Sequence, residues 1–272
     1  MDAPPYPQGA KAPVGAYVIC KNEADVIAGC LLSLSTCREI IVVDSGSTDA
    51  TLAIVEGFER AGWPVRLLHN AWPGYAAQKQ FALERVKEEW ALCLDADERL
   101  DPELSASLAA LAQGAGDVAA FRLRRRLWLH RYGWAHPGTR LGSLVRLTRR
   151  GRARYDPGTL VHEHIHVDGP VRDVRRGAIL HRRSLPVEEQ IVKENRYAAL
   201  KAEQLARAGK GPRVGKLVAN PPYHFLRRYL GQRYVLSGWA GFIHSAMGAI
   251  YAFQTEAILY EKRRAGVDAG RG

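Results

Sequence analysis

Four short apolar runs, each separated from the next by a segment with helical periodicity, constrain the fold of this chain more than any other feature. The runs, rich in β-branched and aliphatic side chains as buried strands are, cover residues 14–20, 39–43, 65–69 and 90–94. The amphipathic segments between them cover residues 23–34, 51–61 and 75–86. Such alternation is typical of a parallel sheet with helices on both faces, so we expect an α/β fold.

Polar residues follow three of the expected strands directly, as Lys21-Asn22-Glu23, Asp44-Ser45-Gly46 and Asp95-Ala96-Asp97. Because ligands of open α/β sheets bind beyond the carboxyl ends of the strands, we expect these three groups to line one site.

The pair Asp95 and Asp97 has the spacing of a metal-binding element. Two carboxylates at the end of a buried strand can hold Mg²⁺ or Mn²⁺ against the phosphates of a nucleotide. The alternative is that they cap the next helix, but Asp101, which precedes Pro102, is better placed for capping.

Several ordered segments together resemble the family 2 glycosyltransferases. They are VICKNE, EIIVVDSGSTDAT, GYAAQKQFAL and WALCLDADERLDPEL. The resemblance is closest to the lipopolysaccharide-core β-glucosyltransferase group, which shares the QK element, the DADE signature and a later VHE. It covers roughly residues 14–182 clearly, and the C-terminal tract more loosely. It implies a GT-A (Rossmann-like) fold, with a mixed, mostly parallel sheet flanked by helices and a C-terminal helical extension.

The same resemblance implies an inverting, metal-dependent hexosyltransferase that uses a nucleotide-sugar, with UDP-glucose as the expected donor. It places Glu23 and Asp44 at the base and ribose of the nucleotide. Gln78 and Lys79 match positions near the diphosphate. Asp95 and Asp97 match the metal motif, with Asp97 as the direct ligand and a catalytic residue.

The catalytic base is expected on the acceptor side of the chain. Glu163, in the segment Leu160-Val161-His162-Glu163, is the best match, and Asp156 is the alternative. A carboxylate there can accept the proton of the acceptor hydroxyl during attack on the anomeric carbon. For both residues, an ion pair with a neighbouring arginine is the competing structural role.

Residues 162–166 also satisfy HExxH, a zinc pattern when both histidines lie on one face of a helix. Here Pro157-Gly158 and Asp168-Gly169 leave too little room for a helix, and the alternation predicts a strand. We therefore do not expect a zinc protease.

Positive charge is concentrated between Arg122 and Arg183, which contains sixteen arginines, no lysine and four acidic residues in a chain of net charge +11. Arginine favours bidentate recognition of phosphate or carboxylate, so we expect an anionic acceptor. A solvated basic face and a nucleic-acid- or polyanion-binding protein are the alternatives. The sequence has no helix-turn-helix or zinc knuckle, and we expect no nucleic-acid partner. A nucleotidyltransferase is less favoured, because the first strand lacks a glycine-rich phosphate loop.

Residues 235–253 form an uncharged stretch between basic flanks. We expect a helix lying in the membrane headgroup region, with a packed soluble helix and a true span as alternatives. The acceptor would then be a lipid-anchored anionic saccharide such as the inner core of lipopolysaccharide, or alternatively a polyprenyl phosphate.

The expected organisation is a disordered lead over residues 1–13, a catalytic domain over 14–182 and a helical, membrane-associating extension over 183–272. Within the catalytic domain, residues 14–116 would form the donor half and 117–182 the acceptor half. Four cysteines without CxxC spacing indicate a reducing compartment. We expect a cytoplasmic enzyme, peripheral on the inner face of the plasma membrane.

Overall fold

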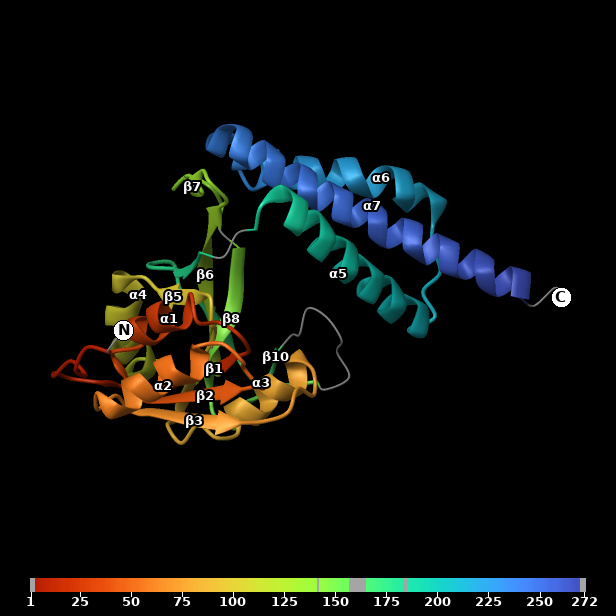
Figure 1. Cartoon of the computed structure of the whole chain (residues 1–272). Helices are drawn as coiled ribbons and strands as arrows, with labels where there is room; N and C mark the ends of the chain where they lie inside the picture. Colours follow the sequence, from red (N-terminus) through yellow and green to blue (C-terminus); the bar gives the residue numbers. More distant parts are fainter. Residues whose placement is uncertain (1–2, 141, 157–164, 183–184, 270–272) are drawn as a thin grey trace. The chain divides into compact units, whose positions relative to one another are not determined.

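A computed structural model describes residues 3–140, 142–156, 165–182 and 185–269. The chain forms two compact units (Figure 1). The first contains residues 1–126 and 142–182, and the second contains residues 127–141 and 183–272. Residues 127–141, which lie within the expected catalytic range, thus cluster with the C-terminal helices.

The first unit is built on the expected alternation of strands and helices. Its parallel strands are β1 (Ala12–Cys20), β2 (Cys37–Asp44), β3 (Val65–His69) and β4 (Trp90–Asp95), in the order β3-β2-β1-β4. The connecting helices are α1 (Ile27–Ser33), α2 (Thr51–Arg60) and α3 (Tyr75–Leu83). Helix α1 begins later than expected, because the backbone turns at Asn22, whose φ is 56°.

Antiparallel strands extend this sheet beyond β4 in the order β8-β6-β12-β5. They are β5 (Glu98–Leu100), β6 (Ala120–Leu129), β8 (Gly142–Arg149) and β12 (Ile179–His181). A short strand, β11 (Val171–Asp173), pairs in parallel with β6. The sheet is therefore mixed, with a parallel core that ends at the polar groups after β1, β2 and β4.

Helix α4 (Pro102–Gln113) begins as expected, because the side chain of Asp101 accepts a hydrogen bond from the Leu104 amide at 2.7 Å. A separate hairpin joins β9 (Ala153–Tyr155) to β10 (Ile165–Val167). His166 therefore lies in a strand, as predicted for this part of the HExxH segment, whereas His162, Glu163 and His164 lie outside the described residues.

Both faces of the parallel core are buried, because alternate residues of its strands point in opposite directions. Val18 and Val42 pack on one face with residues of α1, α2 and α4. Ile19 and Val43 pack on the other face with residues of α3. Residues 3–11, expected as part of a disordered lead, pack on this unit: the Tyr6 hydroxyl donates to the Cys37 carbonyl at 2.6 Å, and the Tyr6 ring lies against Trp63.

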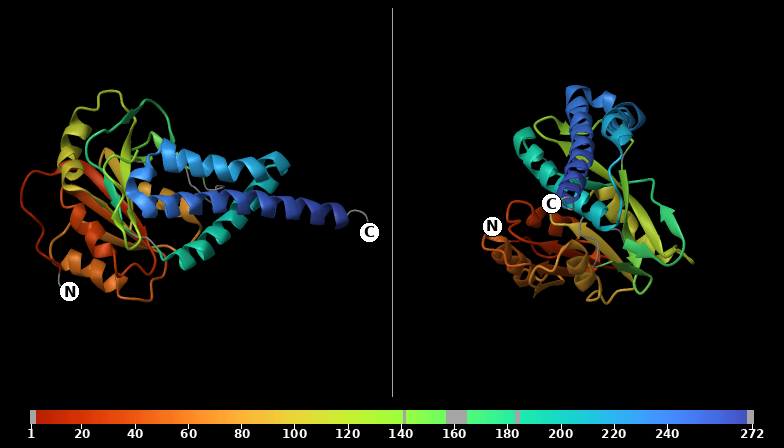
Figure 2. Two further views of the ribbon diagram at one scale, coloured as in Figure 1. Left: turned by 90° about the horizontal axis from the view of Figure 1, so that it is seen from above. Right: turned by 90° about the vertical axis from the view of Figure 1, so that its right-hand side faces the viewer.

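The second unit is mainly helical, with α5 (Val187–Arg207), α6 (Val214–Leu226) and α7 (Gly238–Ala269) (Figure 2). A π-helical turn, η1 (Arg227–Gly231), and a 3₁₀ turn, η2 (Tyr234–Ser237), link α6 to α7, which packs against α5 and α6. Strand β7 (Gly133–Trp134) pairs with the end of β6. The uncharged stretch 235–253 covers most of η2 and the first half of α7. Among the described helices, none is long and apolar enough to cross a membrane.

Candidate functional site

Hydrogen bonds join the loops after β1 and β2 into one rim. The Asn22 amide donates to the Ser47 hydroxyl at 2.9 Å, and the Thr48 amide donates to the Asn22 side chain at 2.8 Å. The Glu23 amide donates to the Thr51 hydroxyl at 2.8 Å. These contacts place Glu23, which is half-buried, on the same sheet edge as Asp44, the residue that ends β2.

Asp44 is buried and is held by its own loop. Its carboxylate accepts hydrogen bonds from the Gly46 amide at 2.8 Å and the Ser47 amide at 3.0 Å, and from the Ser47 hydroxyl. Burial alone would raise the pKa of this carboxyl, but the donors from Ser47 and Gly46, with His69 nearby, lower it overall. Asp44 is therefore a fixed anion that can accept a further hydrogen bond from a ligand.

Helix α3 directs two buried polar side chains into this rim. Gln78 donates to the Ser45 hydroxyl at 2.9 Å and accepts from the Asn70 side chain at 2.6 Å, so it connects the loops after β2 and β3. The ammonium group of Lys79 lies 2.8 Å from a carboxylate oxygen of Asp95. The two residues expected near the diphosphate thus contact both halves of the rim.

Asp95 is held by two cations rather than standing free. Its second carboxylate oxygen lies 2.7 Å from the guanidinium of Arg146, a buried residue of β8. Burial would raise the pKa of this carboxyl, but Arg146 and then Lys79 hold it well below its usual range. With both oxygens occupied by cations, Asp95 orients Lys79 and Arg146 in this structure.

Glu98 completes this buried network. It has no exposed surface, and its carboxylate lies 3.0 Å from Arg146 and 3.1 Å from the Nε of Arg125. It also accepts a hydrogen bond from the Asp95 amide at 3.1 Å. The sequence did not identify Arg146, although an arginine between Val145 and Leu147 in a central strand is a recognisable signal for a buried ion pair.

Asp97 occupies a different environment from Asp95. Its carboxylate lies 3.2 Å from the Nε2 of His181, which ends β12 opposite Glu98. Burial opposes ionisation, but the hydrogen bond to His181 and the charge of that histidine lower the pKa of Asp97 overall. His181 was not predicted, because its proximity arises from antiparallel pairing across about eighty positions of sequence.

A metal ion would find two suitable donor atoms on this edge. In the part of the chain that the structure describes, no group of three or more His, Cys, Asp or Glu side chains is arranged to hold a metal. Asp97 and His181 offer one oxygen and one nitrogen, a mixed set that Mn²⁺ accepts when phosphate oxygens supply the remaining positions. The residues present therefore fit a metal that is shared with a phosphorylated ligand.

The acceptor side is only partly described. Glu163 lies outside the described residues. Asp156 is described and exposed, and it follows Tyr155, whose buried hydroxyl lies 3.0 Å from that of Tyr17. The structure therefore leaves the choice between Glu163 and Asp156 as a prediction.

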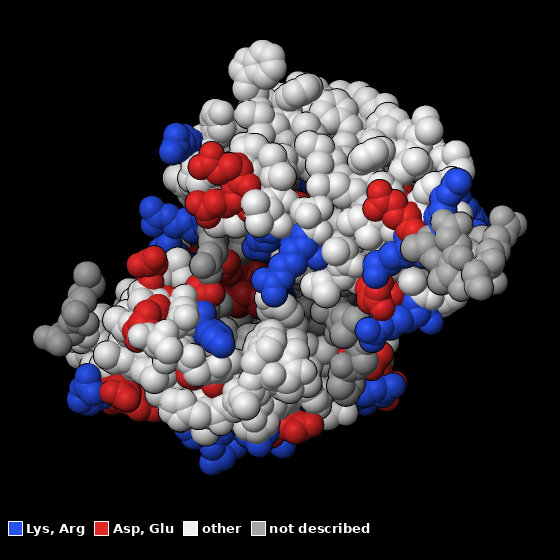
Figure 3. Space-filling view, turned by 45° about the vertical axis from the view of Figure 1, so that its right-hand side comes forward, with Lys and Arg blue, Asp and Glu red and all other residues white. Residues whose placement is uncertain are grey.

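The arginine-rich segment does not form one uniform basic face. Arg146 and Arg125 pair with Glu98, Arg122 pairs with Asp173 at 2.9 Å, and Arg149 pairs with Glu89 at 3.2 Å. On the face drawn in Figure 3, basic side chains are interspersed with acidic ones. This mixture is unlike the continuous basic stripe of nucleic-acid-binding surfaces.

Known proteins similar to this chain are glycosyltransferases. The model of the family described as Glycosyl transferase family 2 matches residues 16–167. A protein of Rhizobium meliloti (strain 1021), lipopolysaccharide core biosynthesis glycosyltransferase LpsC, is 44% identical over 93% of both chains. An uncharacterized glycosyltransferase of Rickettsia bellii (strain RML369-C) is 27% identical over 91% of this chain and 86% of its own.

A solved structure shares the fold. Residues 1–349 of S. aureus TarS, crystallised in complex with UDP, align with a TM-score of 0.51 at 15% identity, over 89% of this chain and 91% of that chain. This likeness concerns the fold alone and confirms the expected GT-A architecture.

Proposed function

The chain belongs to glycosyl transferase family 2, and we propose that its sheet edge binds a nucleotide-sugar and transfers the hexose, with inversion, to an anionic saccharide. UDP-glucose is the proposed donor. The observation that carries this proposal is the arrangement at the carboxyl ends of β2 and β4, where Asp44, Lys79 bound to Asp95, and Asp97 bound to His181 lie on one edge.

Each group has a distinct proposed task. Asp44, an acceptor fixed by its loop, takes a hydrogen bond from the base, and Glu23 lies beside the ribose. Asp95 and Gln78 hold Lys79 in place, so that its ammonium partly neutralises the diphosphate without a cost of ordering a flexible side chain. Asp97 and His181 would hold the divalent cation, which supplies charge stabilisation to the leaving diphosphate.

Inversion requires a base on the face of the sugar opposite the leaving group. We assign this role to Glu163, with Asp156 as the alternative, because both follow the arginine-rich strands on the acceptor side of the chain. Replacement of the correct residue by its amide should abolish transfer while leaving donor binding intact.

The proposed acceptor is lipid-anchored and anionic, like the inner core of lipopolysaccharide; LpsC, at 44% identity, carries a name from lipopolysaccharide core biosynthesis. The second unit supports contact with an anionic membrane surface. Residues 204–255 contain seven Lys or Arg and no Asp or Glu. In the same stretch Val218 and Trp239 are 72% and 76% exposed, a combination of exposed apolar and basic side chains typical of interfacial helices. This supports a cytoplasmic, peripheral location.

The test is a transfer assay with purified protein, UDP-glucose, Mn²⁺ and a core oligosaccharide acceptor. Wild type should transfer glucose, and Asp97→Asn should lose activity by about 10²-fold or more, since it removes a group that acts on the leaving diphosphate. Asp117→Asn, an exposed change on the loop after α4, serves as the matched control. Equal activity of the Asp97 variant and wild type would overturn the assignment.

Membrane contact has its own test. Vesicles with anionic lipid should bind the full chain, and Trp239→Ser with Val218→Ser should weaken that binding, whereas neutral vesicles should bind neither protein. Equal binding of wild type and variant to anionic vesicles would refute the surface.

A further inference from the structure

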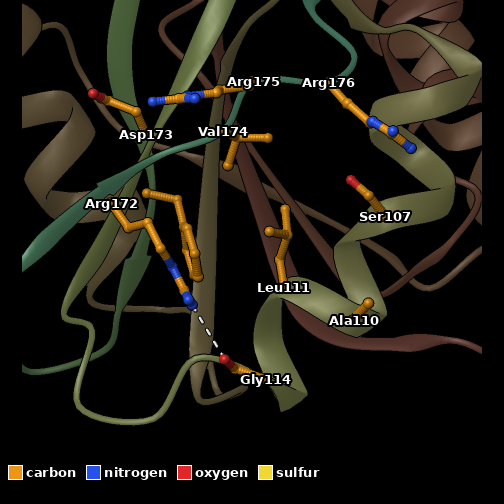
Figure 4. A pocket seen from close by; sticks show the side chains of 10 residues that line it. Ser107, Ala110, Leu111, Gly114, Arg172, Asp173, Val174, Arg175 and Arg176 are labelled. Atoms are coloured by element: carbon orange, nitrogen blue, oxygen red, sulfur yellow. Dashed lines mark hydrogen bonds between the residues drawn. The ribbon is translucent and has the colours of Figure 1, made fainter.

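The first unit contains a cavity on the opposite side of the domain's sequence from the donor residues, between α4 and the segment that follows β11. Its volume is about 410 Å³. Its floor is apolar, from Leu111, Phe121 and Val174, and its rim carries three arginines, Arg172, Arg175 and Arg176 (Figure 4). An apolar floor under guanidinium groups can accept a ligand that has both a hydrocarbon face and an anionic group.

The backbone that carries Arg175 and Arg176 is fixed against α4. The Gly177 amide donates to the Glu103 carboxylate at 3.1 Å, and the Ala178 amide donates to the Asp101 carboxylate at 2.8 Å. Gly177 has a φ of 68°, and a Cβ at this position would lie 2.6 Å from the Leu104 amide nitrogen. Only glycine permits this approach, so the two arginines are presented next to the helix by a rigid segment.

Two of the arginines at the rim lack an internal use. Arg172 donates to the Gly114 carbonyl at 3.2 Å and lies over the Phe121 ring at 4.9 Å. Arg175 and Arg176 are exposed, and no acidic side chain among the described residues pairs with them. Their guanidinium groups therefore remain available to an anion from solution.

The topology separates this cavity from the donor site but links it to that site. Strand β11 pairs with Ala120–Arg122, at the start of β6, whereas Arg125, further along β6, contacts Glu98. The same segment then continues to β12, where His181 contacts Asp97. Four residues separate Gly177 from His181, a distance of roughly 13 Å for extended chain. A ligand that spans more than one sugar unit could therefore contact both places.

We propose that this cavity binds a phosphate or carboxylate group of the acceptor, on a sugar other than the one that reacts. The apolar floor contacts the C–H face of that sugar, and Arg175 and Arg176 bind its anionic group. This inference rests on the proposed function, because it concerns the acceptor of the same transfer. It assigns part of the arginine-rich segment to recognition at a distance from the reacting hydroxyl.

The experiment compares Arg175→Ala/Arg176→Ala with wild type, using a phosphorylated core oligosaccharide and the same oligosaccharide after its phosphates are removed. The matched control is Arg60→Ala/Arg150→Ala, two exposed arginines of the same unit that lie outside the cavity. For the phosphorylated acceptor, the KM of the cavity variant should rise by about five- to thirtyfold, as expected for the loss of two exposed ionic contacts. Its kcat, its donor KM and its rate of donor hydrolysis should match wild type.

The dephosphorylated acceptor decides the chemistry. Wild type should lose affinity for it by a similar factor, and the cavity variant should no longer distinguish the two acceptors. If the variant discriminates between them as strongly as wild type does, the proposal is wrong. If inorganic phosphate stabilises wild type alone while acceptor KM is unchanged by the substitutions, the cavity is a free-anion site and the proposal is also wrong. Failure of the proposed function itself is distinguishable, since wild type would then transfer no hexose to either acceptor.

Discussion

Removal of Arg146 tests the buried charge network on which the donor site is built. Arg146 is buried, and its guanidinium lies 2.7 Å from Asp95 and 3.0 Å from Glu98. The Arg146→Met substitution keeps most of the side-chain volume but leaves Glu98, which has no exposed surface, with Arg125 as its remaining cation. Loss of one member of a buried ionic network costs about 3–5 kcal/mol, because the remaining charge stays desolvated.

The expected loss is therefore about 3–5 kcal/mol in the free energy of unfolding of the first unit. Urea unfolding followed by circular dichroism measures it, with each transition analysed separately because the chain has two units. Arg38→Met is the matched control: its partner Glu88 lies 3.8 Å away at the surface, and the expected loss is below about 1 kcal/mol.

A double variant separates charge from packing. Adding Glu98→Gln to Arg146→Met removes the uncompensated carboxylate, so the double variant should be more stable than the sum of the two single losses predicts, by about 1–3 kcal/mol. The reasoning is refuted if Arg146→Met costs less than about 1 kcal/mol, or if the two losses add without coupling.

Further predictions concern backbone, acid stability and thiols. Gly177→Ala should destabilise the chain by more than about 1 kcal/mol in urea unfolding, because it places a Cβ against Leu104 at positive φ; an unchanged midpoint would contradict this. Stability should fall as pH drops below about 4: the folded pKa values of Asp44, Asp95 and Asp97 are lowered, so their contribution is present above the unfolded value and lost as pH falls through the folded ones. Urea midpoints between pH 3 and 6 should show a smaller slope for Asp44→Asn than for wild type. Burial raises the pKa of the Cys20 and Cys37 thiols to about 12, so Ellman's reagent should label them in urea and not in the folded chain.

The parallel core was predictable because each of its strands and helices carries a local pattern. The runs that became β1, β2, β3 and β4 are continuous apolar segments, and Asp101 with Pro102 marks the start of α4 in the sequence itself. The rim residues Asp44 and Asp95 followed from the rule that polar residues after parallel strands share one edge.

The remainder of the site depends on pairings that no local pattern encodes. Arg146 reaches Asp95 because β8 runs antiparallel beside β4, and His181 reaches Asp97 because β12 pairs with β5. The same pairings turn Asp95 from an expected metal ligand into the partner of two cations. The residues 127–141 join the helical unit through β7 and Tyr234, contacts that were invisible in the sequence.

The central claim is that the sheet edge binds a nucleotide-sugar through its diphosphate and a divalent cation. Thermal unfolding in the presence of UDP-glucose, with and without Mn²⁺, tests it most directly, since a ligand present at about 100 times its Kd stabilises the folded state by about 2.7 kcal/mol. Wild type should be stabilised by UDP-glucose in a Mn²⁺-dependent manner, and Asp97→Asn should lose that dependence while keeping its own unfolding temperature near that of wild type. The claim is contradicted if no nucleotide-sugar shifts the unfolding temperature, with or without Mn²⁺.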